Sequence, residues 1–251
     1  MGRCCLALLM WIQVAPAAAL TLFEAPTHLR FSAVEVSQAA RSEGPAPPAA
    51  AARCRAACAR IERVWARLLP VALQQPHDPA ASLRLVIAAG GDSAYAHADG
   101  SIVFPAALAE ALDLRDEEIA FILAHEIVHV LLEHEREILT AADLMLRPDV
   151  RRSAADIYAA LRFDLGLSLK TSFLMQAAEY EADAYGLQLA ALAGFDPERQ
   201  LGALDKLLAA RTDRAAVVAT HPRDAERLQR LRAVLPVARA VSAARRGERG
   251  E

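Results

Sequence analysis

The sequence of 251 residues contains no asparagine and only two lysines, and aromatic residues make up 5% of it. It also lacks a surplus of basic charge, because the net charge is −3 and the pI is near 6.2. A chain without that surplus cannot neutralise many phosphates, so no nucleic acid partner is expected. Alanine supplies much of the 55% hydrophobic content, which favours helices. The length fits one main domain with extensions.

Long hydrophobic runs are also missing after the N-terminus. Residues 1–19 place one arginine before about a dozen apolar residues and end in small residues, which is the layout of a cleaved secretory signal. Gln13 and Pro16 interrupt this run, and it is shorter than the roughly 20 residues of a spanning helix. We therefore expect export with cleavage after Ala19. The alternative is a retained N-terminal anchor, and peripheral membrane association stays open.

Cysteine is scarce as well, and removal of the signal leaves only Cys54 and Cys58. Export permits a disulfide, but a bridge between residues four apart within one continuous helix is strained. A bridge and two unpaired thiols are equally compatible with the sequence, and neither makes these residues catalytic.

The rest of the chain divides into three predicted parts. Residues 20–50 lack steady periodicity and end in a stretch rich in proline and alanine, which is typical of an extension or linker. Residues 51–240 contain the periodic segments and form the predicted domain. Residues 241–251 have no apolar face, so we predict a disordered tail.

The predicted β structure is confined to a small part of the domain. A β-branched run over 83–89 predicts one strand. Residues 93–105 predict two short strands joined around Asp99 and Gly100, a pair typical of hairpin turns. The sheet is therefore expected to be small.

Helical periodicity dominates after Pro105. Long helices are expected over 116–139 and 173–194, and shorter ones begin near Pro197 and Pro222. The predicted fold class is mainly α with a small β-sheet, an α+β arrangement.

The stretch HEIVH, residues 125–129, carries the predicted chemistry. Two histidines four apart project from one face of a helix and can converge on one cation. Glu126 lies on the adjoining flank, where its carboxylate can take a proton from a water at the metal. This HExxH pattern predicts one Zn²⁺ per chain, with His125 and His129 as ligands and Glu126 as general base. The alternative is a chance match on a surface helix, which the apolar neighbours disfavour.

A third ligand must come from elsewhere in the chain. His134 lies on a different face of the same predicted helix, so we expect it at the surface. The later stretch EYEAD offers Glu179 as a ligand and Asp183, four residues on, as the acceptor that orients a histidine. Ala182 and Gly186 would let two helices approach closely. The alternative is an ordinary acidic helix surface, which is how we interpret Glu181.

Together these motifs resemble a known family. HEIVH followed by EYEAD, GFDPE and THPRDAER is similar to the zinc peptidases related to HtpX and the CAAX prenyl proteases, most of all to the soluble exported branch represented by BepA. The resemblance covers roughly residues 83–235. It implies a zincin-like peptidase domain, and it maps the third zinc ligand onto Glu179 and the conserved aspartate of that motif onto Asp183.

The resemblance also gives roles to His221 and Arg227, in the stretch THPRDAER. It implies that His221 occupies the open zinc site in a resting state or stabilises the oxyanion. Both residues are therefore predicted to take part in catalysis. From the residues alone, His221 is more simply a helix-start residue, and Arg227 could equally be a structural ion-pair partner. The hairpin departs from the family pattern, since DSAYAHADG replaces an expected asparagine-alanine pair. A peptide substrate can still pair with the backbone of the predicted edge strand Ala94, Tyr95, Ala96 and His97.

The predicted function is a zinc-dependent endopeptidase of the periplasm. By family analogy, its polypeptide substrates are misfolded or misassembled envelope proteins. The alternative is a zinc-dependent periplasmic chaperone or assembly factor that rarely cuts its clients. A retained N-terminal anchor would leave the domain facing the periplasm.

Overall fold

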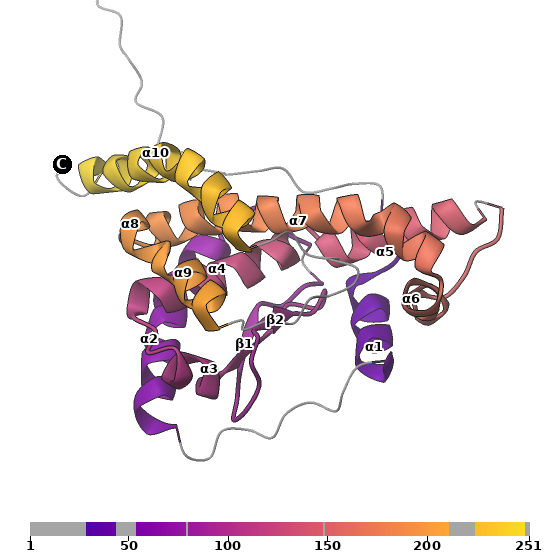
Figure 1. Cartoon of the computed structure of the whole chain (residues 1–251), viewed down its shortest axis with the longest axis horizontal. Helices are drawn as coiled ribbons and strands as arrows, with labels where there is room; N and C mark the ends of the chain where they lie inside the picture. Colours follow the sequence, from indigo (N-terminus) through magenta and orange to yellow (C-terminus); the bar gives the residue numbers. More distant parts are fainter. Residues whose placement is uncertain (1–28, 44–53, 79, 148, 211–223, 249–251) are drawn as a thin grey trace, which may run out of the picture.

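The computed structural model describes residues 29–43, 54–78, 80–147, 149–210 and 224–248 (Figure 1). The predicted signal over 1–19 lies outside these residues, as does His221. Within them the chain is mostly helical with one small sheet, which confirms the predicted fold class. None of the helices in the described ranges is both long and apolar enough to cross a membrane.

The sheet has three strands in the order β1-β3-β2: β1 (Arg84–Ala88), β2 (Tyr95–Ala96) and β3 (Ser101–Pro105). β1 runs parallel to β3, and β2 pairs antiparallel with β3, with Tyr95 opposite Val103. The predicted strand and hairpin are therefore confirmed. Gly100 in the hairpin turn has φ +90°, and a Cβ atom there would lie 2.4 Å from the carbonyl oxygen of Ser82. Only glycine fits this position.

The main hydrophobic core lies between the sheet and a layer of helices. Helix α4 is buried on almost every side, which explains its nearly continuous apolar sequence. In Figure 1, α7 runs across the width of the molecule beside α4, and α10 lies over α7. The helices that contribute to this core are α2 (Arg55–Ala72), α3 (Ala106–Ala111), α4 (Asp116–Leu131), α7 (Leu165–Leu192), α9 (Gly202–Ala210) and α10 (Asp224–Glu248). The short helix α8 (Pro197–Gln200) lies against α4, α7 and α10.

A second, smaller core lies at the other end of α7. It is formed by α1 (Ala33–Glu43), α5 (His134–Leu146), α6 (Ala154–Phe163) and the buried Leu167 of α7. Helix α1 was not predicted from the sequence. It falls within the expected extension over 20–50, and Arg41 joins it to the sheet through an ion pair with Asp99.

Three helix boundaries differ from the sequence predictions. The expected helix over 116–139 is broken: α4 ends at Leu131, and α5 begins at His134 after Glu133 adopts φ +58°. The predicted disordered tail is wrong for residues 241–248, because they form the last turns of α10 with Val241 buried. The sequence left α7 unassigned before residue 173, whereas it starts at Leu165.

The two cysteines form a disulfide in this structure. Cys54 is the N-cap residue of α2 and lies outside the helix, whereas Cys58 lies in its first turn. The bridge therefore closes the start of α2 and does not cross-link two positions inside a continuous helix.

Candidate metal centre

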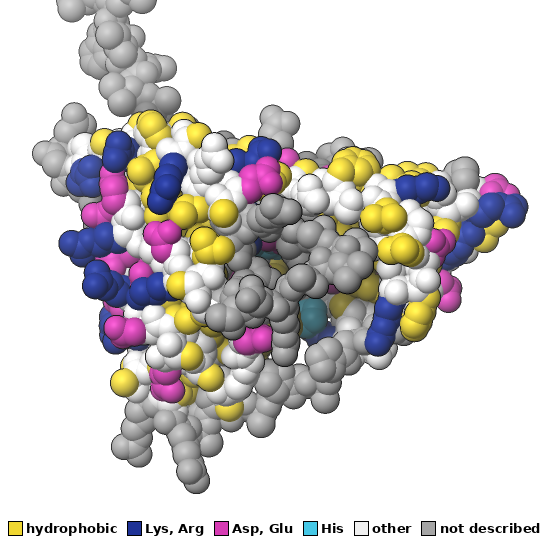
Figure 2. Space-filling view, in the orientation of Figure 1, with side chains coloured by type: hydrophobic (Ala, Val, Ile, Leu, Met, Phe, Trp, Pro, Cys, Tyr) yellow, Lys and Arg dark blue, Asp and Glu magenta, His cyan; other side chains and the backbone are white. Residues whose placement is uncertain are grey.

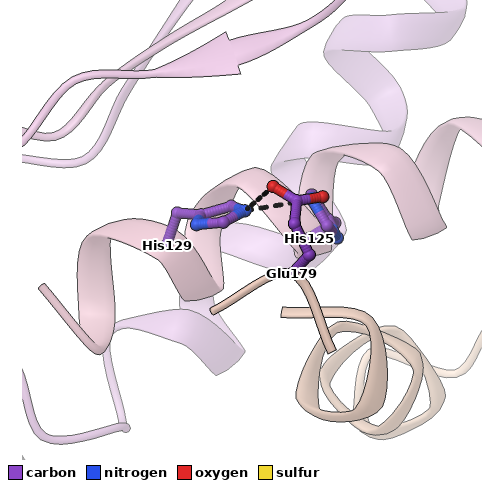
Figure 3. A group of neighbouring side chains, drawn as sticks. All are labelled: His125, His129 and Glu179. Atoms are coloured by element: carbon purple, nitrogen blue, oxygen red, sulfur yellow. Dashed lines mark hydrogen bonds and ion pairs between the residues drawn. The ribbon is translucent and has the colours of Figure 1, made fainter. Parts of the chain in front are cut away.

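Three side chains from two helices meet at one point in the structure (Figure 3). His125 and His129 come from α4, and Glu179 comes from α7. Their Nε2 atoms lie 3.6 Å and 3.5 Å from the two carboxylate oxygens of Glu179. The two Nε2 atoms lie 3.0 Å apart. The structure thus brings together the three residues that the sequence proposed as zinc ligands.

Close approach of α4 and α7 makes this meeting possible. Ala182 is fully buried between the helices. A Cβ atom on Gly186 would lie 2.9 Å from the backbone nitrogen of His125, so a side chain there would push α7 away. The small residues of α7 therefore set the depth at which Glu179 reaches the histidines.

Asp183 of α7 orients the imidazole ring of His125. Its Nδ1 atom lies 3.0 Å from Oδ1 of Asp183, and since a carboxylate only accepts, Nδ1 donates. The lone pair of the neutral ring is then on Nε2, which faces Glu179. Burial lowers the pKa of His125, but the hydrogen bond to Asp183 and the charges of Glu179 and Asp183 raise it more, and the net shift is upward.

His129 is oriented by a histidine that the sequence placed at the surface. His134 is only 3% exposed, and its Nδ1 lies 2.9 Å from Nδ1 of His129. Its Nε2 lies 3.2 Å from Oε2 of Glu181, so Nε2 donates to that carboxylate. In the neutral ring Nδ1 of His134 then accepts, and Nδ1 of His129 donates to it. The surface assignment of His134 is therefore wrong, whereas Glu181 is 55% exposed, as expected.

When both rings are neutral, these hydrogen bonds leave a lone pair on each Nε2 atom, and the two lone pairs face each other. Two acceptors at 3.0 Å cannot bond to each other, but a cation between them satisfies both. Tetrahedral zinc with bonds of about 2.1 Å spaces its ligand atoms about 3.4 Å apart, close to the distances in this cluster. Burial, followed by the charges of His125 and His134, holds the pKa of His129 well below its usual value, so the ring is neutral as a ligand must be. The cluster fits a zinc ion.

Arg227 of α10 contacts the carboxylates of both Asp183 and Glu179. Its guanidinium donates two hydrogen bonds to Asp183, at 2.8 Å and 2.7 Å, and Nη1 lies 3.3 Å from Oε2 of Glu179. Burial raises the pKa of Asp183, but the hydrogen bonds from Arg227 and His125 lower it more, so the carboxylate stays ionised. In this arrangement Arg227 positions two carboxylates. The role predicted for its companion His221 stays a prediction.

Glu126 lies on the flank of α4, next to the sheet. Its carboxylate is half-buried and accepts a backbone hydrogen bond from Ala96 in β2. Burial is the main cause that raises the pKa of Glu126 to about 7, and the charge of Glu179 raises it further, against the lowering effect of His125. A base of this pKa suits proton transfer at neutral pH. The predicted edge strand therefore adjoins the predicted base.

Comparison with known proteins agrees with this arrangement. The model of peptidase family M48 matches residues 56–235, which include every residue of the cluster. No curated protein and no solved structure gives a significant match. Because the match spans most of the sequence, the chain belongs to peptidase family M48, a family of zinc metallopeptidases.

Proposed function

We propose that this protein is a zinc-dependent endopeptidase that cleaves misfolded or misassembled envelope proteins in the periplasm. The observation that carries the peptidase activity is the convergence of His125, His129 and Glu179 at one point, with Glu126 on the adjoining flank. Export is supported by the signal-like residues 1–19. The substrate class rests on the resemblance to envelope proteases.

Zinc held by two histidines and one carboxylate would polarise a peptide carbonyl and lower the pKa of a coordinated water to about 7. Glu126 accepts a proton from the attacking water as the new carbon–oxygen bond forms. It then donates this proton to the amide nitrogen as the carbon–nitrogen bond breaks, leaving a carboxylic acid and an amine. Asp183 and His134 hold the two imidazoles in the tautomers that direct Nε2 to the centre.

Substrate would bind along β2. This strand is at the edge of the sheet, and no other described strand pairs with its free side. It also lies beside Glu126, through the hydrogen bond from Ala96. An extended peptide added antiparallel or parallel to Tyr95 and Ala96 would place its backbone next to the base, without a requirement for one side-chain sequence. Unfolded chains can adopt this extended form, whereas folded proteins seldom expose it.

The decisive experiment compares wild type with Glu126→Gln on unfolded and native envelope proteins. We expect wild type to cut the unfolded proteins, and Glu126→Gln to retain stoichiometric zinc while losing activity by about a hundredfold or more. Glu110→Gln makes the same chemical change at an exposed position of α3 and should act as wild type. The chaperone alternative predicts no fragments from wild type and equal suppression of client aggregation by Glu126→Gln.

A further inference from the structure

Exposed hydrophobic side chains are concentrated in one segment. Thirteen large hydrophobic side chains are exposed in the described part of the chain, and seven of these fall between residues 144 and 173. Four of the seven are the most exposed of all: Phe163 at 78%, Leu165 at 60%, Phe173 at 59% and Leu169 at 52%. We call the seven residues the apolar end; they are Leu144, Met145, Val150, Phe163, Leu165, Leu169 and Phe173.

The apolar end belongs to one region of the fold. It is carried by the end of α5, the following loop, the end of α6 and the start of α7, which together form the narrow end of the molecule in Figure 1. On α7, Leu165, Leu169 and Phe173 recur every four residues and therefore share one helix face. Leu167 and Thr171 on the opposite face are buried. Helix α7 therefore buries one face in the smaller core and exposes a second face that is also apolar.

Basic side chains surround these residues. Residues 144–173 contain five basic and three acidic side chains, although the whole chain has a net charge of −3. The acids are engaged locally: Asp156 accepts hydrogen bonds from Ser153 at the start of α6, Asp164 caps α7, and Asp149 pairs with Arg147. Figure 2 shows hydrophobic, basic and acidic side chains next to one another at this end. The basic residues are Arg147, Arg151, Arg152, Arg162 and Lys170.

We propose that the apolar end docks onto the surface of a bilayer that contains anionic phospholipids. Its phenylalanine and leucine side chains would enter the boundary between headgroups and acyl chains, and Arg151 and Lys170 would lie against phosphates. Arg147 and Arg152 are ion-paired with Asp149 and Asp143. The region is a protruding end, which suits a broad surface better than a single peptide. No described helix could span the bilayer, so the contact is a docking at the surface. This proposal stands independently of the peptidase activity.

Flotation with lipid vesicles tests the proposal. The full chain is mixed with vesicles of phosphatidylcholine alone, or of phosphatidylcholine with one third phosphatidylglycerol. We expect wild type to partition about tenfold or more in favour of the anionic vesicles, and the Phe163→Ser/Phe173→Ser variant to lose about tenfold or more of that binding. Leu73→Ser/Val237→Ser removes side chains that are 51% and 50% exposed elsewhere and should float as wild type does.

Separate measurements distinguish docking from misfolding and from other partners. Circular dichroism and zinc content should be the same in all variants, because the substituted side chains lie at the surface. Arg151→Gln/Lys170→Gln should reduce binding to anionic vesicles and leave weak binding to phosphatidylcholine unchanged. The proposal is overturned if the phenylalanine variant floats as well as wild type, or if wild type does not float. Concentration-dependent dimers that only this variant abolishes would assign the apolar end to a second copy of the chain instead.

Discussion

At the scale of single residues, the Nδ1 atom of His129 depends on a side chain from the next helix. His134 accepts this hydrogen bond because its own Nε2 is committed to Glu181. The two successive hydrogen bonds, between Glu181 and His134 and between His134 and His129, therefore fix the tautomer of His129. Asp183 fixes the tautomer of His125 in the same way. Partners of this kind orient metal ligands and raise their basicity.

We predict that His134→Ala weakens zinc binding about tenfold, because His129 loses the partner that fixes its ring. Titration with a competing chelator measures the zinc dissociation constant. His77→Ala removes a histidine whose Nδ1 lies 2.8 Å from the nearby carbonyl oxygen of Gln75, and it serves as the control. An unchanged dissociation constant in His134→Ala would mean that α4 alone orients His129.

The two sides of the metal centre differ in how far the sequence could predict them. The spacing of His125 and His129 on one helix follows from helical geometry, and Glu179 was found through its own spacing and the family resemblance. His134 could not be found in this way, because its contact requires the break between α4 and α5. That break is made by Glu133 at φ +58°, and neither glycine nor asparagine marks it in the sequence.

At the scale of elements, the packing of α4 against α7 determines the geometry of the centre. Gly186 allows the backbone of α7 to lie against His125, and Ala182 fills the next position on the same face. Glu179 lies two turns earlier on α7. A change in the distance between the helices therefore moves this ligand relative to both histidines.

We predict that Gly186→Ala lowers the free energy of unfolding by about 1–3 kcal/mol, because the new methyl group overlaps the backbone of His125. It should also weaken zinc binding. Urea unfolding and zinc titration measure the two effects. Gly247→Ala in α10 meets nothing within 4 Å and should be neutral or slightly stabilising. Equal stability of the two variants would show that α4 and α7 can separate at little cost.

Element boundaries were predicted least well where tertiary contacts decide them. The apolar period of 116–139 continues through the break at Glu133, because α5 also buries residues such as Leu139. Residues 241–248 have little apolar character of their own, yet α10 continues there beside Gly194 and the start of α8. The Asp99–Gly100 hairpin was predicted correctly because its turn chemistry is local.

At the scale of the whole molecule, the metal centre joins distant parts of the chain. His125 and His129 come from α4, Glu179 and Asp183 from α7, and Arg227 from α10. A ligand that binds only the folded arrangement stabilises all of these contacts at once. Zinc would therefore stabilise the folded main domain in addition to taking part in its chemistry.

We predict that removal of zinc lowers the melting temperature by about 10 °C. Free zinc at a thousandfold excess over its dissociation constant contributes about 4 kcal/mol, and each kcal/mol shifts a domain of this size by about 2–4 °C. Thermal unfolding with a chelator, and again after zinc is returned, measures this shift. Magnesium should not restore stability, since it prefers oxygen ligands. Identical melting curves with and without zinc would contradict the assignment of the cluster as a zinc site.

One unbroken helix, α7, carries Leu165 at its first position and Glu179 fourteen residues later. At 1.5 Å per residue, these two positions are about 21 Å apart along the axis. If the apolar end rests on a bilayer, the length of α7 limits the distance between the lipid surface and the metal centre to about 21 Å. The scissile bond would then lie within this distance of the lipid. A substrate still anchored in the membrane would then need at most about six residues of extended chain, at about 3.3 Å each, to reach the metal centre.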